Sequence, residues 1–138
     1  LDYAFIFGRG NVDTCLVTSK WKGIADVSVV NAEIKFDSGD VINYRCKWNM
    51  PGPWSCAVTT KSQRIELRPL EKLSHQRLGS KNINSVRLGG LEQRFKAGFY
   101  FQALDVIRAI QSENPASTVP SWSENQKVMK LMHQIYAI

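Results

Sequence analysis

Apolar and polar residues alternate along the middle of the chain in three successive runs, at residues 30–36, 42–48 and 54–58. Turn-forming segments separate the runs: residues 37–40 read Asp-Ser-Gly-Asp, and residues 49–53 contain two prolines and a glycine. A period of two interrupted by turns is typical of consecutive antiparallel strands with one apolar and one polar face. We therefore predict an antiparallel sheet whose apolar face must pack against another element. Its apolar positions are Val30, Ala32, Ile34, Phe36, Ile42, Tyr44, Cys46, Trp48, Trp54, Cys56 and Val58.

The remaining segments complete an α+β pattern. Further strands are expected at residues 11–21 and 64–67, and the polar stretch from Ser74 to Gly90 predicts a mobile loop. Residues 1–7 read as the end of a helix that Gly8 closes. Leu1 stands inside this helical pattern and no initiating Met precedes it, so we expect the chain to be part of a longer protein.

Two longer helices are expected near the C-terminus. From Leu91 to Gln111 the apolar residues fall at steps of three and four, which is typical of an amphipathic helix. Gly98 lies inside that pattern and suggests close packing at this point. Ser121 and Glu124 have the spacing of a capping box, and a last helix runs from there to Tyr136. The predicted fold is one α+β domain over residues 1–138, a mostly antiparallel open sheet with helices packed on one face.

The opposite face of the sheet is polar and is left free for dimerisation. Its charges are of both signs, as a self-complementary interface between two copies requires. The predicted dimer-face residues are Asn31, Glu33, Lys35, Asn43, Arg45 and Lys47.

Composition narrows the range of partners. The net charge is +6, but Lys and Arg are scattered over all predicted elements without a basic run between aromatics, so we expect no nucleic-acid partner. The expected role of the charge is a solvated basic surface, and the alternative is a basic lining for a phosphorylated or nucleotide-linked substrate. No apolar run approaches the roughly 20 residues of a membrane-spanning helix, and we expect no membrane partner.

Cys15, Cys46 and Cys56 lack metal-site spacing. A hairpin between the second and third runs would set Cys46 opposite Cys56, as two buried thiols or as a disulfide; we expect thiols, and a cytoplasmic protein.

Few segments have the residue pattern of a cofactor, metal or substrate site. Gly8-Arg9-Gly10 begins a dinucleotide fingerprint, but Asp13 replaces its third glycine, and the segment follows a helix rather than a strand. His75 and His133 have no second ligand at metal spacing. The turn between Trp48 and Trp54 is open to two interpretations: the indoles pack across a hairpin, or Trp48, Asn49 and Trp54 face a sugar substrate.

The order of these segments resembles the C-terminal domain of the Gfo/Idh/MocA oxidoreductases, the glucose–fructose oxidoreductase and inositol dehydrogenase family. Residues 1–8 resemble the end of the family's catalytic-His helix, and residues 32–39 resemble its strand ending in F-x-x-G. Trp48 to Pro51 resembles its W-x-x-P, residues 95–102 its F-x-x-G-F/Y-x-x-Q helix, and residues 128–136 its closing helix. The matching pieces span nearly the whole chain.

This resemblance implies a parent enzyme that acts on a sugar, polyol or sugar nucleotide with NAD or NADP. It places the cofactor on an N-terminal Rossmann domain that is absent from this chain, and that domain would be the chain's partner in the parent. Of the family's active-site positions only Asp2 falls within residues 1–138, so we expect no cofactor and no catalysis here. The open sheet face commonly makes the dimer in this family. The alternative is a stand-alone α+β interaction module without enzymatic activity.

Overall fold

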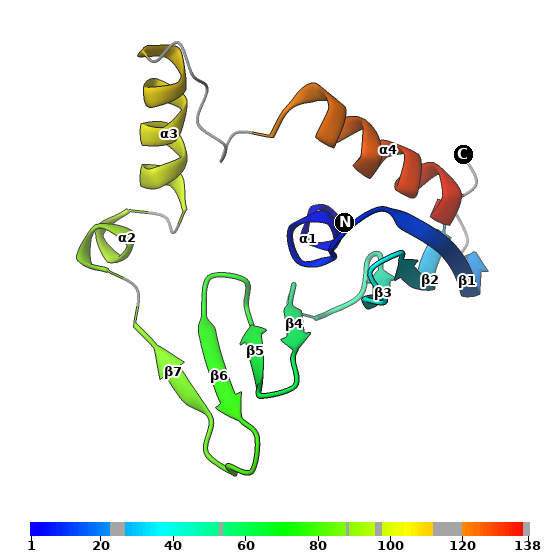
Figure 1. Ribbon diagram of the computed structural model, residues 1–138, viewed down its shortest axis with the longest axis horizontal. Coiled ribbons are helices and arrows are strands. Elements are labelled where there is room, and N and C mark those ends of the chain that lie inside the picture. The colour runs from blue at the N-terminus through cyan, green and yellow to red at the C-terminus, as the bar shows by residue number, and fades with distance from the viewer. Residues whose placement is uncertain (23–26, 53, 88, 96–97, 112–119, 137–138) are drawn as a thin grey trace. The chain divides into compact units, whose positions relative to one another are not determined.

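The computed structural model describes residues 1–22, 27–52, 54–87, 89–95, 98–111 and 120–136, and shows an α+β protein with antiparallel sheets (Figure 1). The chain divides into two compact units. The first unit comprises Leu1–Pro51 and Ser121–Ile138, and the second comprises Gly52–Pro120. The single domain expected from the chain length stays a prediction.

The first unit is a three-stranded sheet with two helices. Strands β1 (Val12–Lys22), β2 (Val27–Phe36) and β3 (Val41–Lys47) are antiparallel, with β2 in the centre. Ala32 of β2 pairs with Val17 of β1 and Tyr44 of β3. Helix α1 (Asp2–Phe7) precedes the sheet, and helix α4 (Trp122–Tyr136) returns to it from the C-terminal part of the chain.

The core of this unit lies on one face of β2. Val30, Ala32, Ile34 and Phe36 are each 3% exposed or less, as the alternation predicted. Leu131 and Ile135 of α4 and Ala4 of α1 complete the buried cluster. Leu131 and Ile135 are four residues apart and therefore lie on the same side of the helix. The last helix thus covers the sheet as predicted, whereas the contribution of α1 was not predicted.

Both helices of the first unit begin or end at residues with an identifiable role. The capping box is confirmed: the Ser121 backbone N–H donates to Glu124 Oε2 over 2.7 Å, and the Glu124 N–H donates to Ser121 Oγ over 3.3 Å. Gly8 ends α1 with extended backbone rather than in a left-handed cap. A Cβ on Gly8 would stand 2.5 Å from the Phe36 ring, so this glycine is required for close packing on the sheet.

The second unit holds a separate sheet. Strands β4 (Cys56–Thr59), β5 (Gln63–Leu67), β6 (Leu73–Arg77) and β7 (Asn84–Val86) follow one another in sequence order. The prediction that the third alternating run extends the first sheet is therefore wrong. This run forms β4, which pairs with β5 across the short turn Thr60–Ser62. Cys46 lies opposite Val30 and Cys56 opposite Leu67, so the predicted pairing of Cys46 with Cys56 is wrong. All three cysteines are free thiols and half-buried.

Two further predictions in this unit are wrong for local reasons. The stretch from Ser74 to Gly90, predicted as a loop, contains most of β6 and all of β7; β6 pairs with β5, and β7 pairs with β6. The long helix is broken into α2 (Gly90–Arg94) and α3 (Phe99–Gln111). Gly98 adopts φ +86, outside helical geometry, and no atom lies within 4 Å of its would-be Cβ. Phe95 already ends α2 with extended backbone, so Gly98 stands between the two helices instead of packing closely within one, and α3 buries none of its residues.

Candidate functional site

The open face is the sheet surface of the first unit that points away from α1 and α4. Its residues alternate along the strands with the buried ones, and the register aligns them in rows across the sheet. Asn31 stands opposite Ser19 and Arg45, and Glu33 opposite Leu16 and Asn43. The open face comprises Thr14, Leu16, Ser19, Trp21, Val29, Asn31, Glu33, Lys35, Val41, Asn43, Arg45 and Lys47. All six residues predicted for the dimer face lie on it, and their role in assembly stays a prediction.

Hydrogen bonds hold the polar centre of this face in one arrangement. Arg45 Nε donates to Asn31 Oδ1 over 2.9 Å, and Asn31 Nδ2 donates to Ser19 Oγ. Lys35 Nζ lies 3.3 Å from Glu33 Oε1. Each of the three strands contributes to this chain of contacts, so the polar groups are oriented before any partner arrives.

Three large apolar side chains flank the polar centre and were not predicted as part of the face. Leu16 and Trp21 of β1 are 62% and 57% exposed, and Val41 of β3 is 51% exposed. The register shift between Val17 and Ser19 interrupts the alternation of β1. For this reason the apolar residues of that strand could not be assigned to one face from the sequence. The edges of the open face therefore offer apolar contact around a polar centre.

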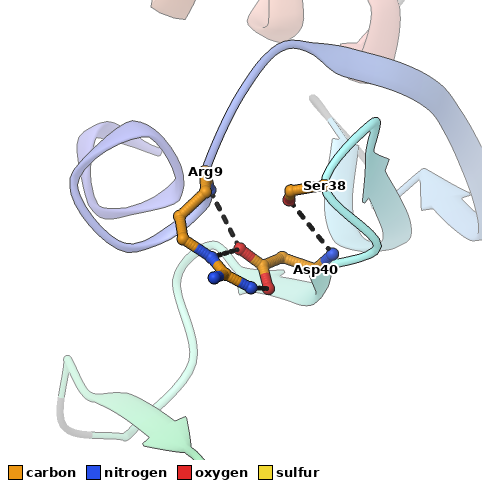
Figure 2. Close-up of polar contacts among 3 residues, drawn as sticks. All are labelled: Arg9, Ser38 and Asp40. Carbon is orange, nitrogen blue, oxygen red and sulfur yellow. Dashed lines mark hydrogen bonds and ion pairs between the residues drawn. The ribbon is translucent and has the colours of Figure 1, made fainter.

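Gly8-Arg9-Gly10 has a structural role between α1 and β1 (Figure 2). The guanidinium of Arg9 makes two contacts of 2.8 Å to the carboxylate of Asp40, and the Arg9 backbone N–H donates to the same carboxylate over 3.0 Å. Hydrogen bonds from Arg9 hold the pKa of Asp40 well below its usual range. Gly10 has φ +81, and a Cβ there would overlap Asp37. The segment is engaged with the β2–β3 turn and does not fit a dinucleotide.

The predicted substrate-side residues belong to different structural elements, and Trp54 belongs to the second unit. Asp2 is exposed in the first turn of α1. Trp48 and Asn49 follow β3 directly, both exposed, and Asn49 adopts φ 56, a left-handed conformation that asparagine tolerates. Trp54 belongs to the second unit and is 81% exposed. The predicted hairpin between Trp48 and Trp54 is wrong, because β3 ends at Lys47 and β4 pairs with β5.

Trp48 lies beside a polar cluster at the end of α4. The hydroxyls of Tyr44 and Tyr136 are 2.9 Å apart, and Lys20 Nζ donates to the backbone carbonyl of Tyr136. Burial raises the pKa of both tyrosines, and Cys46 raises them further. A hydrogen bond with Trp48 lowers the pKa of Tyr136 and so opposes the effect of burial. These contacts fasten the C-terminal turn of α4 to β1 and β3.

No metal site emerges from the part of the chain that the structure describes, since no group of three His, Cys, Asp or Glu side chains could hold an ion there. His75 lies on β6, and within the described residues its buried Nδ1 has no hydrogen-bond partner.

None of the described helices is both long and apolar enough to cross a membrane. No family model, curated protein or solved structure matches the chain, so the resemblance to the Gfo/Idh/MocA family stays a prediction.

Proposed function

We propose that the chain is the C-terminal, substrate-side and dimerisation domain of an NAD(P)-dependent oxidoreductase of sugar metabolism. Its substrate is a sugar, a polyol or a sugar nucleotide. One observation carries the proposal: the sheet of the first unit is covered by α1 and α4 on one face and presents a polar face on the other. Such a sheet suits a domain that supports an active site while it joins two subunits.

A second copy of the chain is the proposed partner of the open face. An interface around a twofold axis brings the same surface of both copies together, so each charge needs an opposite charge on that same surface. Glu33 supplies the acid, and Lys35, Arg45 and Lys47 supply the bases. Leu16 and Val41 add apolar contact at the two edges. The excess of basic residues makes the two faces repel, so we expect the dimer to become tighter when moderate salt screens them.

Catalysis in this proposal belongs to the complete enzyme and not to this chain alone. NAD or NADP would bind the parent's own Rossmann domain, because neither antiparallel sheet of the described residues carries the glycine-rich strand-to-helix turn that a dinucleotide requires. Asp2, Trp48, Asn49 and Trp54 are the substrate-side candidates. A cytoplasmic location is proposed from the three free thiols.

Sedimentation across a range of concentrations tests the dimer. We expect the chain to associate reversibly, and Glu33→Lys to weaken association by about 1 kcal/mol or more, since the single acid among the residues of the open face becomes a fourth base. Glu71→Lys is the matched control, because it changes the charge equally at an exposed turn of the second unit. A chain that stays monomeric at high concentration would remove the proposal for the open face. Equal weakening by both substitutions would show that only net charge matters.

A second test separates the oxidoreductase from a stand-alone interaction module. Calorimetric titration of the chain with NAD or NADP at millimolar concentration should give no saturable heat, and micromolar affinity would contradict the proposed assignment. The gene region before Leu1 should encode a strand followed by G-x-G-x-x-G and a later Glu-Lys-Pro. A gene without these segments would favour the interaction module.

A further inference from the structure

Strand β3 forms one edge of the sheet in the first unit. The strand order is β1-β2-β3, and within the described residues no further strand pairs with the outer side of β3. Its pairing with β2 is regular from Val41 to Lys47, without a register shift. The other edge strand, β1, has three register shifts, and irregularities of this kind hinder the addition of a strand. The outer side of β3 is therefore the regular edge of this sheet.

Hydrogen bonds at the β2–β3 turn show which backbone groups of β3 point outwards. The Phe36 N–H donates to the Asp40 carbonyl over 2.9 Å, whereas the Asp37 N–H donates to the Asn11 carbonyl, just before β1. Successive residues of an antiparallel strand bond to opposite neighbours, so the even-numbered residues of β3 bond to β2. The residues whose N–H and C=O groups point away from β2 are Val41, Asn43, Arg45 and Lys47. Within the described residues no backbone hydrogen bond outside the two sheets involves these groups.

The side chains of β3 determine what an added strand should carry. On the open face, Arg45 and Lys47 are basic, and neither forms an ion pair within the described residues. On the covered face, Ile42 and Tyr44 are half-buried and pack against the core. A strand added beside β3 places its side chains alternately next to these two pairs. Acidic residues suit the open face, and apolar residues suit the covered face.

We propose that the outer edge of β3 binds an extended segment of another protein, in which acidic and apolar residues alternate. The segment adds an antiparallel strand to the sheet, so that backbone hydrogen bonds provide affinity and the alternating side chains provide specificity. Acids opposite Arg45 and Lys47 form ion pairs that these two residues lack within the described chain. The proposal does not depend on the oxidoreductase assignment, because it rests only on the edge of the sheet.

Amide NMR of the whole chain tests the edge directly. The probe is a capped synthetic peptide in which Glu and Val alternate over the length of β3. We expect saturable shifts along β3, and slower amide exchange at Asn43 and Arg45 in the complex, because their N–H groups gain acceptors. A peptide with the same residues arranged as a Glu block and a Val block should not bind saturably. Equal binding of the block peptide would overturn the proposal, and so would protection of these amides before any peptide is added, since a second copy would then occupy the edge.

Methylation of the peptide backbone distinguishes strand addition from general attraction of acids. Directly opposite residues of an antiparallel pair share a face, so the Glu residues opposite Arg45 and Lys47 turn their N–H groups towards β3. Methylation of the Glu amides should weaken binding by at least about tenfold, since several hydrogen bonds are lost and each is worth about fivefold. Methylation of the Val amides, which face away from β3, should leave the affinity unchanged. Equal losses for the two methylated peptides would overturn the proposal.

Substitutions in the chain test the match of charge. Arg45→Gln should weaken binding of the alternating peptide by about threefold, the value of a cross-strand ion pair. Lys130→Gln removes the same charge from an exposed position of α4 and should leave the affinity unchanged. The amide spectra show whether each variant is folded. Equal weakening by the two substitutions, or tighter binding of a peptide in which Lys and Val alternate, would overturn the proposal.

Discussion

Replacement of Leu131 by Ala tests whether α4 holds the first unit together. Leu131 is 2% exposed and belongs to the cluster that buries the central strand β2. Ala keeps the helix, because its helix propensity is at least as high as that of Leu. The substitution therefore removes packing from the core without weakening the helix itself.

The expected loss follows from the burial of this side chain. Leu-to-Ala substitutions in protein cores lower the free energy of unfolding by about 2–5 kcal/mol, through lost transfer free energy and the cavity left behind. Small domains are stable by only about 5–15 kcal/mol. We expect a loss of about 3 kcal/mol, enough to shift the unfolding midpoint of the first unit well outside experimental error.

Met129→Ala is the matched control on the same helix. Met129 is 48% exposed, so its truncation should change the free energy of unfolding by no more than about 0.5 kcal/mol. Denaturant unfolding followed by circular dichroism compares the variants, and amide exchange at Val30, Ala32 and Ile34 reports the first unit specifically. Equal losses for the two variants, or a Leu131→Ala loss below about 1 kcal/mol, would refute the packing of α4 on β2.

Three further predictions concern titratable groups. Because the pKa of Asp40 is lowered in the folded state, its contribution to stability is present at neutral pH and is lost as the pH falls below about 4. Asp40→Asn should remove this part of the acid sensitivity when the free energy of unfolding is measured over a pH series. Tyr44 and Tyr136 have raised pKa values, so their contribution to stability is lost as the pH rises above about 10. Tyr136→Phe should lower the free energy of unfolding by about 1 kcal/mol at pH 7 and reduce its loss at alkaline pH. Burial raises the pKa of Cys15 and Cys56, so they should react slowly with a thiol reagent in the native protein, and denaturation should release three free thiols.

The alternation along β2 and β3 could be interpreted from the sequence because burial of one face leaves a strict period of two. Strand pairing could not be predicted in the same way, since a period of two gives the face of a residue but not its neighbour strand. The run at residues 54–58 was assigned to the first sheet for this reason. The apolar pattern of residues 91–111 likewise continues past Phe95 and Gly98, although the extended backbone of Phe95 and the left-handed backbone of Gly98 lie outside both helices.

The candidate site was predictable only where it depends on alternation. The polar residues of the open face followed from their positions between buried ones. The contact of Arg9 with Asp40 joins residues 31 positions apart, and nothing in the local pattern of either segment predicts it. The contact between the β4–β5 and β6–β7 turns depends on β6 and β7, which the polar sequence of residues 74–90 did not predict as strands.

The most direct test of the account is whether the open faces of two copies meet. Nuclear Overhauser contacts between isotope-labelled and unlabelled copies in a mixed sample detect such an interface without any substitution. Leu16 and Val41 carry exposed methyl groups on the open face, so they should give contacts between copies. The account predicts these contacts and none from Ile110, which is exposed on α3 of the second unit. A dimer whose contacts come from Ile110, with none from Leu16 or Val41, would contradict it.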